Sequence, residues 1–374
     1  GLMRCEPPVP TEVLDAIRAP LAALAAEAID PPVIQPLNVM LDLAGEAMRA
    51  RLFIVQDEGG REACLRPDFT VAVARAHMQG GKVSGRYRYE GRAFRVAPEG
   101  GGEDHPEEFL QMGVETLGEA SGPEADAAIL TAAWTSAGAG GRDDLALRLG
   151  DVALFGSVLE ALDIPPPVRE RLTRSLGRPR QLAALLQRAG GAEPLIGAAA
   201  EIASMPHGKA VAAIERLWRD EGLEPVGGRG APEIAERLAE RASAARAPRL
   251  TASQLAAIDH FLGLTGSPRE VLDAVGELAG AQIAAAGFEA WDQRLDGLAR
   301  AGADHSRIVL AARFARAFGY YDGFLFEIVA AGLPANAAVA AGGRYDGLTR
   351  QLGGPASSAV GCMVRPARAW RRAP

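Results

Sequence analysis

The chain has 374 residues, of which 48% are hydrophobic and 23% are charged. At roughly 150 residues per domain this length allows two domains, and the composition suits a globular protein with a sizeable buried core. A formal net charge of −7 argues against a general nucleic-acid-binding surface or a surface for anionic membranes.

The cysteines and the apolar runs restrict the kind of site and the compartment. Cys5, Cys64 and Cys362 lie far apart, with no CxxC pair, no metal-ligand spacing and no disulfide pattern. We therefore expect free thiols in a reducing cytoplasm and no metal site. No apolar run reaches the roughly 18 residues that a membrane-spanning helix needs, and the N-terminus lacks a signal-peptide pattern. These features predict a cytoplasmic protein without membrane contact.

The first part of the chain alternates helical and extended patterns. Residues 11–28 predict an amphipathic helix with Thr11 as its N-cap. Residues 63–70 are extended, and a helix over 71–78 follows the proline at 67. A glycine- and acid-rich loop separates the first two of three further predicted strands, which cover 86–96, 109–117 and 145–149.

From about residue 161 to residue 300 the pattern becomes helical. Ala, Leu, Arg and Glu recur at helical spacing, with breaks at the triple proline 165–167 and the glycine pair 190–191. Strands return over 307–312, 320–329, 337–341 and 358–364. We predict an α+β fold in which an antiparallel sheet flanked by helices is formed by 1–160 and 301–374. A mostly helical insertion, 161–300, interrupts it.

Period-two alternation assigns the side chains of two strands to faces. In 109–117 the even positions are mainly apolar, whereas Gln111, Gly113 and Glu115 share the other face. In 320–329 the same rule places Tyr320 with the apolar residues and Tyr321 with the polar ones. The polar faces fit the floor of a pocket, with glycines leaving room for a ligand or for another backbone. An ordinary solvated sheet face gives the same pattern.

The segment AGGRYDGL, 341–348, allows two interpretations. Asp346-Gly347 is a common turn signal, and the paired glycines before it permit a bend. Held between glycines, Arg344 and Tyr345 also suit a rigid recognition loop. The spacing alone favours neither interpretation.

Five motifs follow one another along the chain: LRPDFT (65–70), GRAFR (91–95), EFLQMGVETLG (108–118), RAFGYYDGFLFE (316–327) and AGGRYDGL (341–348). Together they resemble histidyl-tRNA synthetase and its relatives, which share the class II aminoacyl-tRNA synthetase fold. The resemblance covers about 10–160 and 300–368, and the last two motifs are typical of the histidine branch. It implies a class II synthetase-like antiparallel sheet and a pocket for histidine.

The resemblance also implies roles for individual positions. Asp68 stands where an acidic residue accepts the α-amino group of histidine, although a helix cap is an alternative role. Tyr321 and Tyr345 match tyrosines around the imidazole. Tyr320 is included with them, although its strand position favours the core. The expected histidine-binding residues are Asp68, Thr70, Gln111, Glu115, Arg316, Tyr320, Tyr321 and Tyr345.

The chain departs from the synthetase pattern at the nucleotide site. The loop APEGGGEDHPEEF, 97–109, has no Lys or Arg, whereas phosphate sites need cations or aimed N–H groups. Arg365 stands where a glycine normally lets the backbone approach the nucleotide. Arg95 and Arg368 match synthetase arginines, and they form either a vestigial nucleotide site or structural salt bridges. We therefore expect no catalytic residues and no cofactor.

The chain ends soon after 341–348, so we expect no anticodon-binding domain and no tRNA partner. The chain keeps the histidine-pocket motifs of the synthetases but has an altered nucleotide loop. In this combination it resembles the family of regulatory subunits of short-form ATP phosphoribosyltransferase. The resemblance implies a non-catalytic subunit that the short catalytic subunit needs for activity. It further implies that free histidine binds and inhibits the first step of histidine biosynthesis, and that the chain forms a homodimer within a hetero-oligomer.

Two other functions fit the same motifs. One is a histidine-adenylating enzyme related to histidyl-tRNA synthetase, which pyrophosphate exchange with histidine and ATP would reveal. The other is a stand-alone histidine sensor, which a lack of effect on a short catalytic subunit would indicate.

Overall fold

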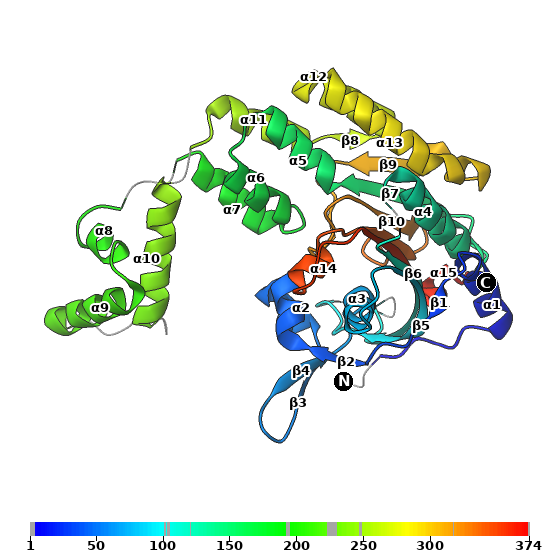
Figure 1. Ribbon diagram of the computed structural model, residues 1–374, viewed down its shortest axis with the longest axis horizontal. Helices are drawn as coiled ribbons and strands as arrows, with labels where there is room; N and C mark the ends of the chain where they lie inside the picture. The colour runs from blue at the N-terminus through cyan, green and yellow to red at the C-terminus, as the bar shows by residue number, and fades with distance from the viewer. Residues whose placement is uncertain are drawn as a thin grey trace. The chain divides into compact units, whose positions relative to one another are not determined.

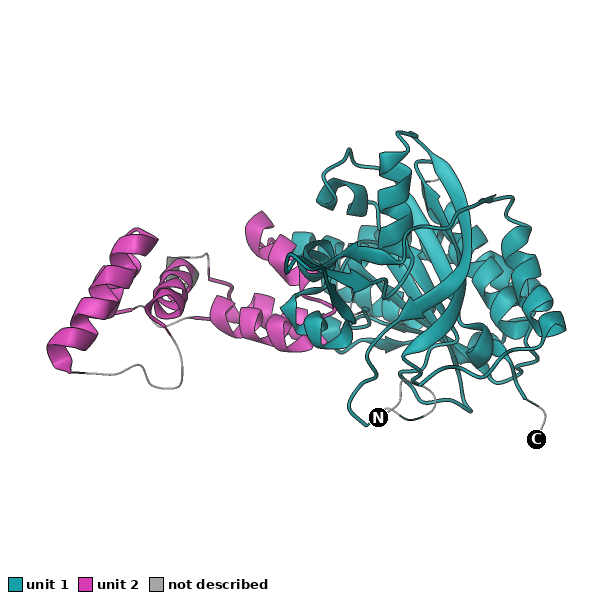
Figure 2. Ribbon diagram, turned by 90° about the horizontal axis from the view of Figure 1, so that it is seen from below, with its two compact units in different colours: residues 1–161, 261–374 teal, residues 162–260 magenta. Residues whose placement is uncertain are grey.

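The structure is a computed structural model that describes residues 4–100, 102, 105–119, 121–191, 195–222, 230–246, 249–316 and 318–372. It divides into two compact units (Figure 2). Unit 1 contains residues 1–161 and 261–374, and unit 2 contains residues 162–260. Within the ranges described, none of the helices is long and apolar enough to cross a membrane.

Unit 1 is built on a sheet whose described strands follow the order β1-β5-β6-β12-β11-β10-β7-β9-β8. Neighbouring strands run antiparallel except in the pairs β1–β5 and β7–β9. In sheet order the bounds are Glu27–Ala28, Gly85–Phe94, Glu108–Leu117, Ala359–Val364, Ala340–Arg344, Phe324–Ala330, Leu145–Asp151, Ile308–Ala311 and Thr265–Gly266. The predicted α+β fold is confirmed, and its sheet is antiparallel through the centre.

Helices cover both faces of this sheet (Figure 1). One face carries α1 (Thr11–Ala22), α4 (Pro123–Gly138), α5 (Val152–Ala161), α12 (Pro268–Ala279) and α13 (Ala281–Arg300). The other carries α3 (Thr70–Gln79), α2 (Leu37–Ala44) and α14 (Leu348–Gln351). In α4 the buried residues Ile129, Ala133 and Ala137 recur every four positions, which gives the helix one apolar stripe against the sheet.

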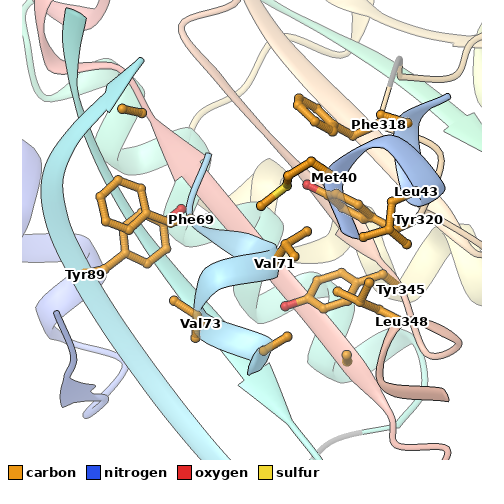
Figure 3. Packing of buried hydrophobic residues seen from close by; sticks show 14 of the residues in the cluster. Met40, Leu43, Phe69, Val71, Val73, Tyr89, Phe318, Tyr320, Tyr345 and Leu348 are labelled. Carbon is orange, nitrogen blue, oxygen red and sulfur yellow. The ribbon is translucent and has the colours of Figure 1, made fainter. Parts of the chain in front are cut away.

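A small antiparallel sheet lies beside α2 and α3. Its strands, in the order β2-β4-β3, cover Ile34–Pro36, Glu62–Leu65 and Ile54–Gln56, and the 3₁₀ helix η1 (Glu46–Arg51) follows α2. Between these elements and the large sheet lies an apolar core in which Phe69 stacks on Tyr89 with 4.3 Å between ring centroids. Figure 3 shows both Tyr345, beside Leu348, and Tyr320, beside Leu43, in this core. The core therefore holds the aromatic residues of the candidate pocket.

Three of the predicted elements differ from the structure by three or more residues at one or both ends. The helix expected over 11–28 ends at Ala22 because Ala25 adopts a left-handed backbone (φ 54°), which leaves the following residues free to form β1. Its expected N-cap, Thr11, is the first helical residue and makes no capping bond. The strand expected over 320–329 begins only at Phe324, and the strand expected over 337–341 covers Ala340–Arg344 because a turn at Pro334 precedes it.

Unit 2 is helical, with α6 (Pro166–Arg174), α7 (Pro179–Ala189), α8 (Ala198–Ala203), α9 (His207–Glu221), α10 (Ala231–Arg246) and the start of α11 (Ala252–Leu262). The compact unit is shorter than the expected insertion 161–300. Residues 261–300 belong to unit 1, because α12 and α13 pack against α5 and α4. Helical periodicity alone does not distinguish helices of an insertion from helices that cover the sheet.

The remaining short elements belong to unit 1. They are the 3₁₀ helix η3 (His305–Arg307), which leads into β9, and α15 (Pro366–Ala369), which follows β12.

Candidate functional site

Most of the predicted pocket residues line one cavity on the α3 side of the large sheet. Its enclosed volume is only about 20 Å³, far below the roughly 300–1,000 Å³ of small-molecule sites. An amino acid would therefore fit only if side chains moved. Tyr321 and Met363 line the cavity and are partly exposed, so we expect these two to move. The predicted histidine-binding residues that line it are Asp68, Thr70, Gln111, Glu115, Arg316, Tyr320 and Tyr321.

Strand β6 supplies the floor of the cavity. Gln111 and Glu115 lie on the same face of this strand, as alternation predicted, and each is 1% exposed. Gly113 lies between them, but a side chain there would meet the Tyr89 hydroxyl and the Cys362 carbonyl at less than 3.0 Å. The glycine therefore leaves room for a neighbouring side chain and backbone. Of the two roles that the sequence allowed, room for a ligand or room for another backbone, the structure shows the second.

Glu115 is held at both carboxyl oxygens. Thr70 Oγ1 donates to Oε1 at 2.7 Å, and the Tyr345 hydroxyl donates to Oε2. Burial raises the pKa of Glu115 to about 8 although both hydrogen bonds act in the opposite direction. Tyr345 thus holds the Glu115 side chain in position through this hydrogen bond, but it does not itself line the cavity.

Two hydrogen-bond acceptors in the cavity lack a donor among the residues that the structure describes. The Tyr320 hydroxyl donates to Asp68 Oδ2 at 3.1 Å, but Asp68 Oδ1 has no partner. Gln111 bonds Tyr89 through Nε2 at 3.3 Å, and its Oε1 also has no partner. Burial raises the pKa of Asp68, against the opposing effect of the Arg95 charge. Because buried acceptors are rarely left unsatisfied, this end of the cavity suits a ligand with N–H donors.

Two guanidinium groups balance these carboxyl groups. Arg316 Nη1 lies 2.7 Å from Glu327 Oε1 on β10. Arg95 also lines the cavity, and its Nε donates to the Pro67 carbonyl at 2.7 Å. Burial lowers the pKa of Arg95 to about 10. The cavity thus offers both charge signs, which complements a zwitterion.

Tyr320 corrects the assignment from strand alternation. It is 3% exposed and belongs to the apolar core, yet it lines the cavity and bonds Asp68. Alternation failed here because Tyr320 and Tyr321 precede β10, so the period of a strand does not apply to them. Their rings lie 4.7 Å apart, and Tyr345 lies 5.8 Å from Tyr320.

The Arg344 side chain in AGGRYDGL has a structural role. Its guanidinium pairs with Asp126 of α4 at 2.7 Å and with Asp346 at 2.8 Å. Asp322 accepts from the Asp346 and Gly347 amides and closes the turn. The loop is therefore a turn that also positions Tyr345 against Glu115, and its part in recognition stays a prediction.

Of the two arginines expected in a vestigial nucleotide site, only Arg95 lines the cavity. Arg368 Nη1 donates to the Ala338 carbonyl at 3.0 Å. Arg365 stacks on Phe109, with 3.6 Å from its Cζ to the ring centroid. In the acidic loop, Gly101, Glu103 and Asp104 lie outside the residues that the structure describes.

The sequence prediction missed Phe318, Cys362 and Met363, which also line the cavity. Strand 358–364 was expected, but its partner was not, and only the pairing of β12 with β6 brings Met363 opposite Gly113. Phe318 lies two positions before Tyr320 in a motif whose two tyrosines were chosen, so this proximity was the available signal. Over the described residues, no group of three or more His, Cys, Asp or Glu side chains is arranged to hold a metal ion.

Glu115 predicts how stability depends on pH. Its pKa is 4.5 in an ordinary environment and about 8 in the folded chain, so folding takes up a proton between these values. The resulting stabilisation is full below the lower value and is lost as pH rises through the higher one. We expect the free energy of unfolding from urea titrations to fall across this interval, and Glu115→Gln to reduce the slope. Asp68, whose pKa shifts in the same direction, leaves a residual slope.

Glu58→Gln provides a matched control for that experiment, because it makes the same substitution at an exposed turn position. Its pH slope should equal that of the parent chain. An unchanged slope in Glu115→Gln would show that the buried carboxyl is ionised throughout the interval.

Comparison with known proteins identifies the fold and the family. The sequence model of the family described as "Histidyl-tRNA synthetase" matches residues 16–229 and 231–368. A solved structure from Bacillus halodurans, described as an ATP phosphoribosyltransferase regulatory subunit/histidyl-tRNA synthetase, has a TM-score of 0.65 at 16% identity, covering 100% of this chain and 83% of that one. Histidyl-tRNA synthetase from Nostoc has a TM-score of 0.57 at 17% identity, covering 95% and 69%. The fold is thus that of the histidyl-tRNA synthetase class.

Curated relatives narrow this class. Proteins named "ATP phosphoribosyltransferase regulatory subunit" are 33% identical in Brucella anthropi, covering 91% of each chain, and 36% identical in Allorhizobium ampelinum, covering 89% of each. The relative of the same name in Agrobacterium fabrum is 34% identical, covering 89% of this chain and 88% of that one. The chain belongs to the family of ATP phosphoribosyltransferase regulatory subunits, as the motifs predicted.

Proposed function

We propose that this chain is a non-catalytic regulatory subunit that binds free histidine in the cavity and carries that signal to a short ATP phosphoribosyltransferase catalytic subunit. The observation that carries the proposal is the pair of unpartnered acceptors, Asp68 Oδ1 and Gln111 Oε1, in a cavity that also holds Glu115. The names of the curated relatives support the regulatory role.

The proposed ligand matches the cavity group by group. An α-ammonium supplies N–H donors to Asp68 in a charge-assisted bond, the kind that is about twice as strong as a neutral one. Gln111 and Glu115 receive the N–H groups of the imidazole, and the ring of Tyr321 lies against it. The positive charge of Arg95 is placed for the α-carboxylate. The family resemblance implied the role of Asp68 and the place of Tyr321 near the imidazole, whereas Arg95 was expected in a vestigial nucleotide site and its role toward the α-carboxylate is part of this proposal.

The surroundings of Phe109 support a sensor over an adenylating enzyme. A synthetase places its nucleotide here, whereas Arg365 covers Phe109 and pairs with Glu6 at 2.7 Å. The described carboxylates Glu99 and Glu107 lie in the adjoining loop, and Glu108 begins β6. Negative charge repels a triphosphate, so we propose that histidine stays unreacted.

Feedback inhibition sets a thermodynamic condition. Histidine must bind two states of the complex with unequal affinity, because a ligand with equal affinity shifts no equilibrium. Ligands of the catalytic subunit must in turn change the affinity for histidine by the same factor. We propose a cytoplasmic homodimer within a hetero-oligomer as the assembly in which this coupling operates.

A mixing assay tests partner and function together. The short catalytic subunit is assayed with ATP and phosphoribosyl pyrophosphate, alone and with the full chain, across a histidine titration. We expect activation by the chain and inhibition by histidine. Tyr321→Phe should keep the activation and shift inhibition to higher histidine, by roughly 0.5–3 kcal/mol for one buried polar contact, or up to about a hundredfold.

The control substitution is Tyr87→Phe, because the Tyr87 hydroxyl bonds His77 at 2.6 Å and does not line the cavity. It should leave histidine inhibition unchanged. A failure to activate the catalytic subunit, or robust pyrophosphate exchange with histidine and ATP, would contradict the regulatory role. Equal inhibition constants for parent and Tyr321→Phe would place histidine elsewhere.

A further inference from the structure

Tyr89 of β5 lies directly opposite Gly113 of β6 in the pairing of these two strands. It is 2% exposed, and its ring stacks on Phe69 with an interplanar angle of 5°. A side chain at Gly113 would meet the Tyr89 hydroxyl at less than 3.0 Å, so the phenol reaches across β6 only because this residue is glycine. The hydroxyl is thereby held over β6 two positions from Gln111, although Tyr89 itself does not line the cavity.

The Tyr89 hydroxyl joins two groups by hydrogen bonds. It donates to the Cys362 carbonyl at 3.3 Å, and it accepts from Gln111 Nε2 at 3.3 Å. A phenol has a single O–H donor, so while this donor is used on the carbonyl the oxygen can only accept from Gln111. Burial and the nearby Glu115 charge hold the pKa of Tyr89 well above its ordinary value. The hydroxyl therefore keeps the proton that it donates.

These two bonds fix the orientation of the Gln111 amide. With Nε2 turned toward Tyr89, Oε1 is left without a partner in the part of the chain that the structure describes. The two ends of an amide are similar in shape, but one donates and the other accepts. Rotation about the last side-chain bond exchanges them easily, because this torsion is broad and roughly two-fold. The Tyr89 hydroxyl thus decides which end of Gln111 is offered to a ligand.

We propose that Tyr89 is a positioning residue for ligand selection. Its hydroxyl holds the Gln111 amide with the oxygen toward the cavity, so the site requires an N–H donor from its ligand at this point. The inference rests on the proposed function, in which an imidazole N–H meets Gln111. A ring of the same size that carries an acceptor there faces the amide oxygen, acceptor against acceptor, and binds weakly. Without the hydroxyl, the amide turns and receives either kind of ring.

Calorimetric titration of full-length variants with histidine and with 3-(4-thiazolyl)alanine tests the proposal. The analogue has the size of histidine and a ring nitrogen that accepts, but it has no ring N–H. The parent chain should bind histidine more tightly than the analogue. Tyr89→Phe should weaken histidine binding by about two- to tenfold, the value of one hydrogen bond, and should bind the analogue at least as tightly as the parent does. A role of Tyr89 in packing alone would weaken both ligands alike.

Gln111→Met supplies the second arm of the experiment, because methionine keeps the length of the side chain without the amide. If Tyr89 acts through Gln111, adding Tyr89→Phe to this variant should leave the ratio of the two affinities unchanged. Tyr87→Phe is the control on the same strand, because the Tyr87 hydroxyl bonds His77 and does not line the cavity. It should keep the parent ratio, and melting curves by circular dichroism verify that each variant is folded.

The proposal is overturned if Tyr89→Phe keeps the parent ratio of the two affinities. It is also overturned if Tyr89→Phe changes that ratio equally with and without the Gln111 amide. A parent chain that does not bind histidine contradicts the proposed function and this inference together. Histidine binding with an unchanged ratio contradicts this inference alone.

Discussion

Asp126→Asn is expected to lower the free energy of unfolding of unit 1 by about 3–5 kcal/mol, the loss typical of breaking a buried ion pair. Asp126 is fully buried and accepts from Arg344 Nη2 at 2.7 Å and from Arg294 Nε at 2.9 Å. Asparagine keeps the volume but leaves two guanidinium groups without their shared counter-charge. Arg294 keeps Asp151 Oδ2 at 3.5 Å and Arg344 keeps Asp346 Oδ1 at 2.8 Å, so we expect a loss at the lower end of this range.

Urea unfolding followed by circular dichroism measures this effect. The control is Asp292→Asn, which removes the same charge from an exposed position on α13 and should change stability by less than about 0.5 kcal/mol. Similar stability losses for the two variants would mean that the network around Asp126 adds nothing beyond an exposed charge. The result matters for the site because Arg344 precedes Tyr345, the donor to Glu115.

Gly361→Ala is expected to abolish histidine binding. A methyl group at this position of β12 would lie less than 3.0 Å from the Glu115 carboxylate and from the Val114 carbonyl of the paired strand. The backbone carbonyl cannot move without breaking the ladder, so the carboxylate must leave its place between Thr70 and Tyr345. Overpacking of this kind also costs about 1–3 kcal/mol of stability.

Calorimetry with histidine, together with a melting curve, separates these two effects. Gly138→Ala on α4 is the matched control, because an added methyl group would meet only Leu145 at 4.0 Å. Alanine in place of a helical glycine should slightly raise stability, by roughly 0.5–1 kcal/mol, and leave binding unchanged. Histidine binding of parent strength in Gly361→Ala would show that the position of the Glu115 carboxylate does not matter for the ligand.

Much of the candidate site was predictable from the sequence because strands have a fixed period. Alternation placed Gln111 and Glu115 on one face of 109–117, and the structure has them there. The same reasoning misplaced Tyr320, because the chain ahead of Phe324 is not a strand. Nothing local marks that boundary: the run from Tyr320 to Val329 is rich in residues that favour strands.

The helical middle of the chain illustrates a different limit. Periodicity predicted helices through 161–300, and the described residues there are mostly helical. It did not distinguish α12 and α13, which cover the sheet, from the helices of unit 2. An apolar stripe shows that a helix is buried on one side, but it does not identify what the helix packs against.

The sequence by itself determined the fold class, the family motifs and which β6 side chains point together, because these depend on short-range periodicity and on residue identity. Only the tertiary structure decided which partners complete the site. Thr70 and Tyr345 meet at Glu115 across separations of 45 and 230 residues, and Glu6 reaches Arg365 across 359. Contacts at such distances arise from the pairing of β6 with β5 and β12. This pairing depends on the burial of whole strands, and no local sequence pattern predicts it.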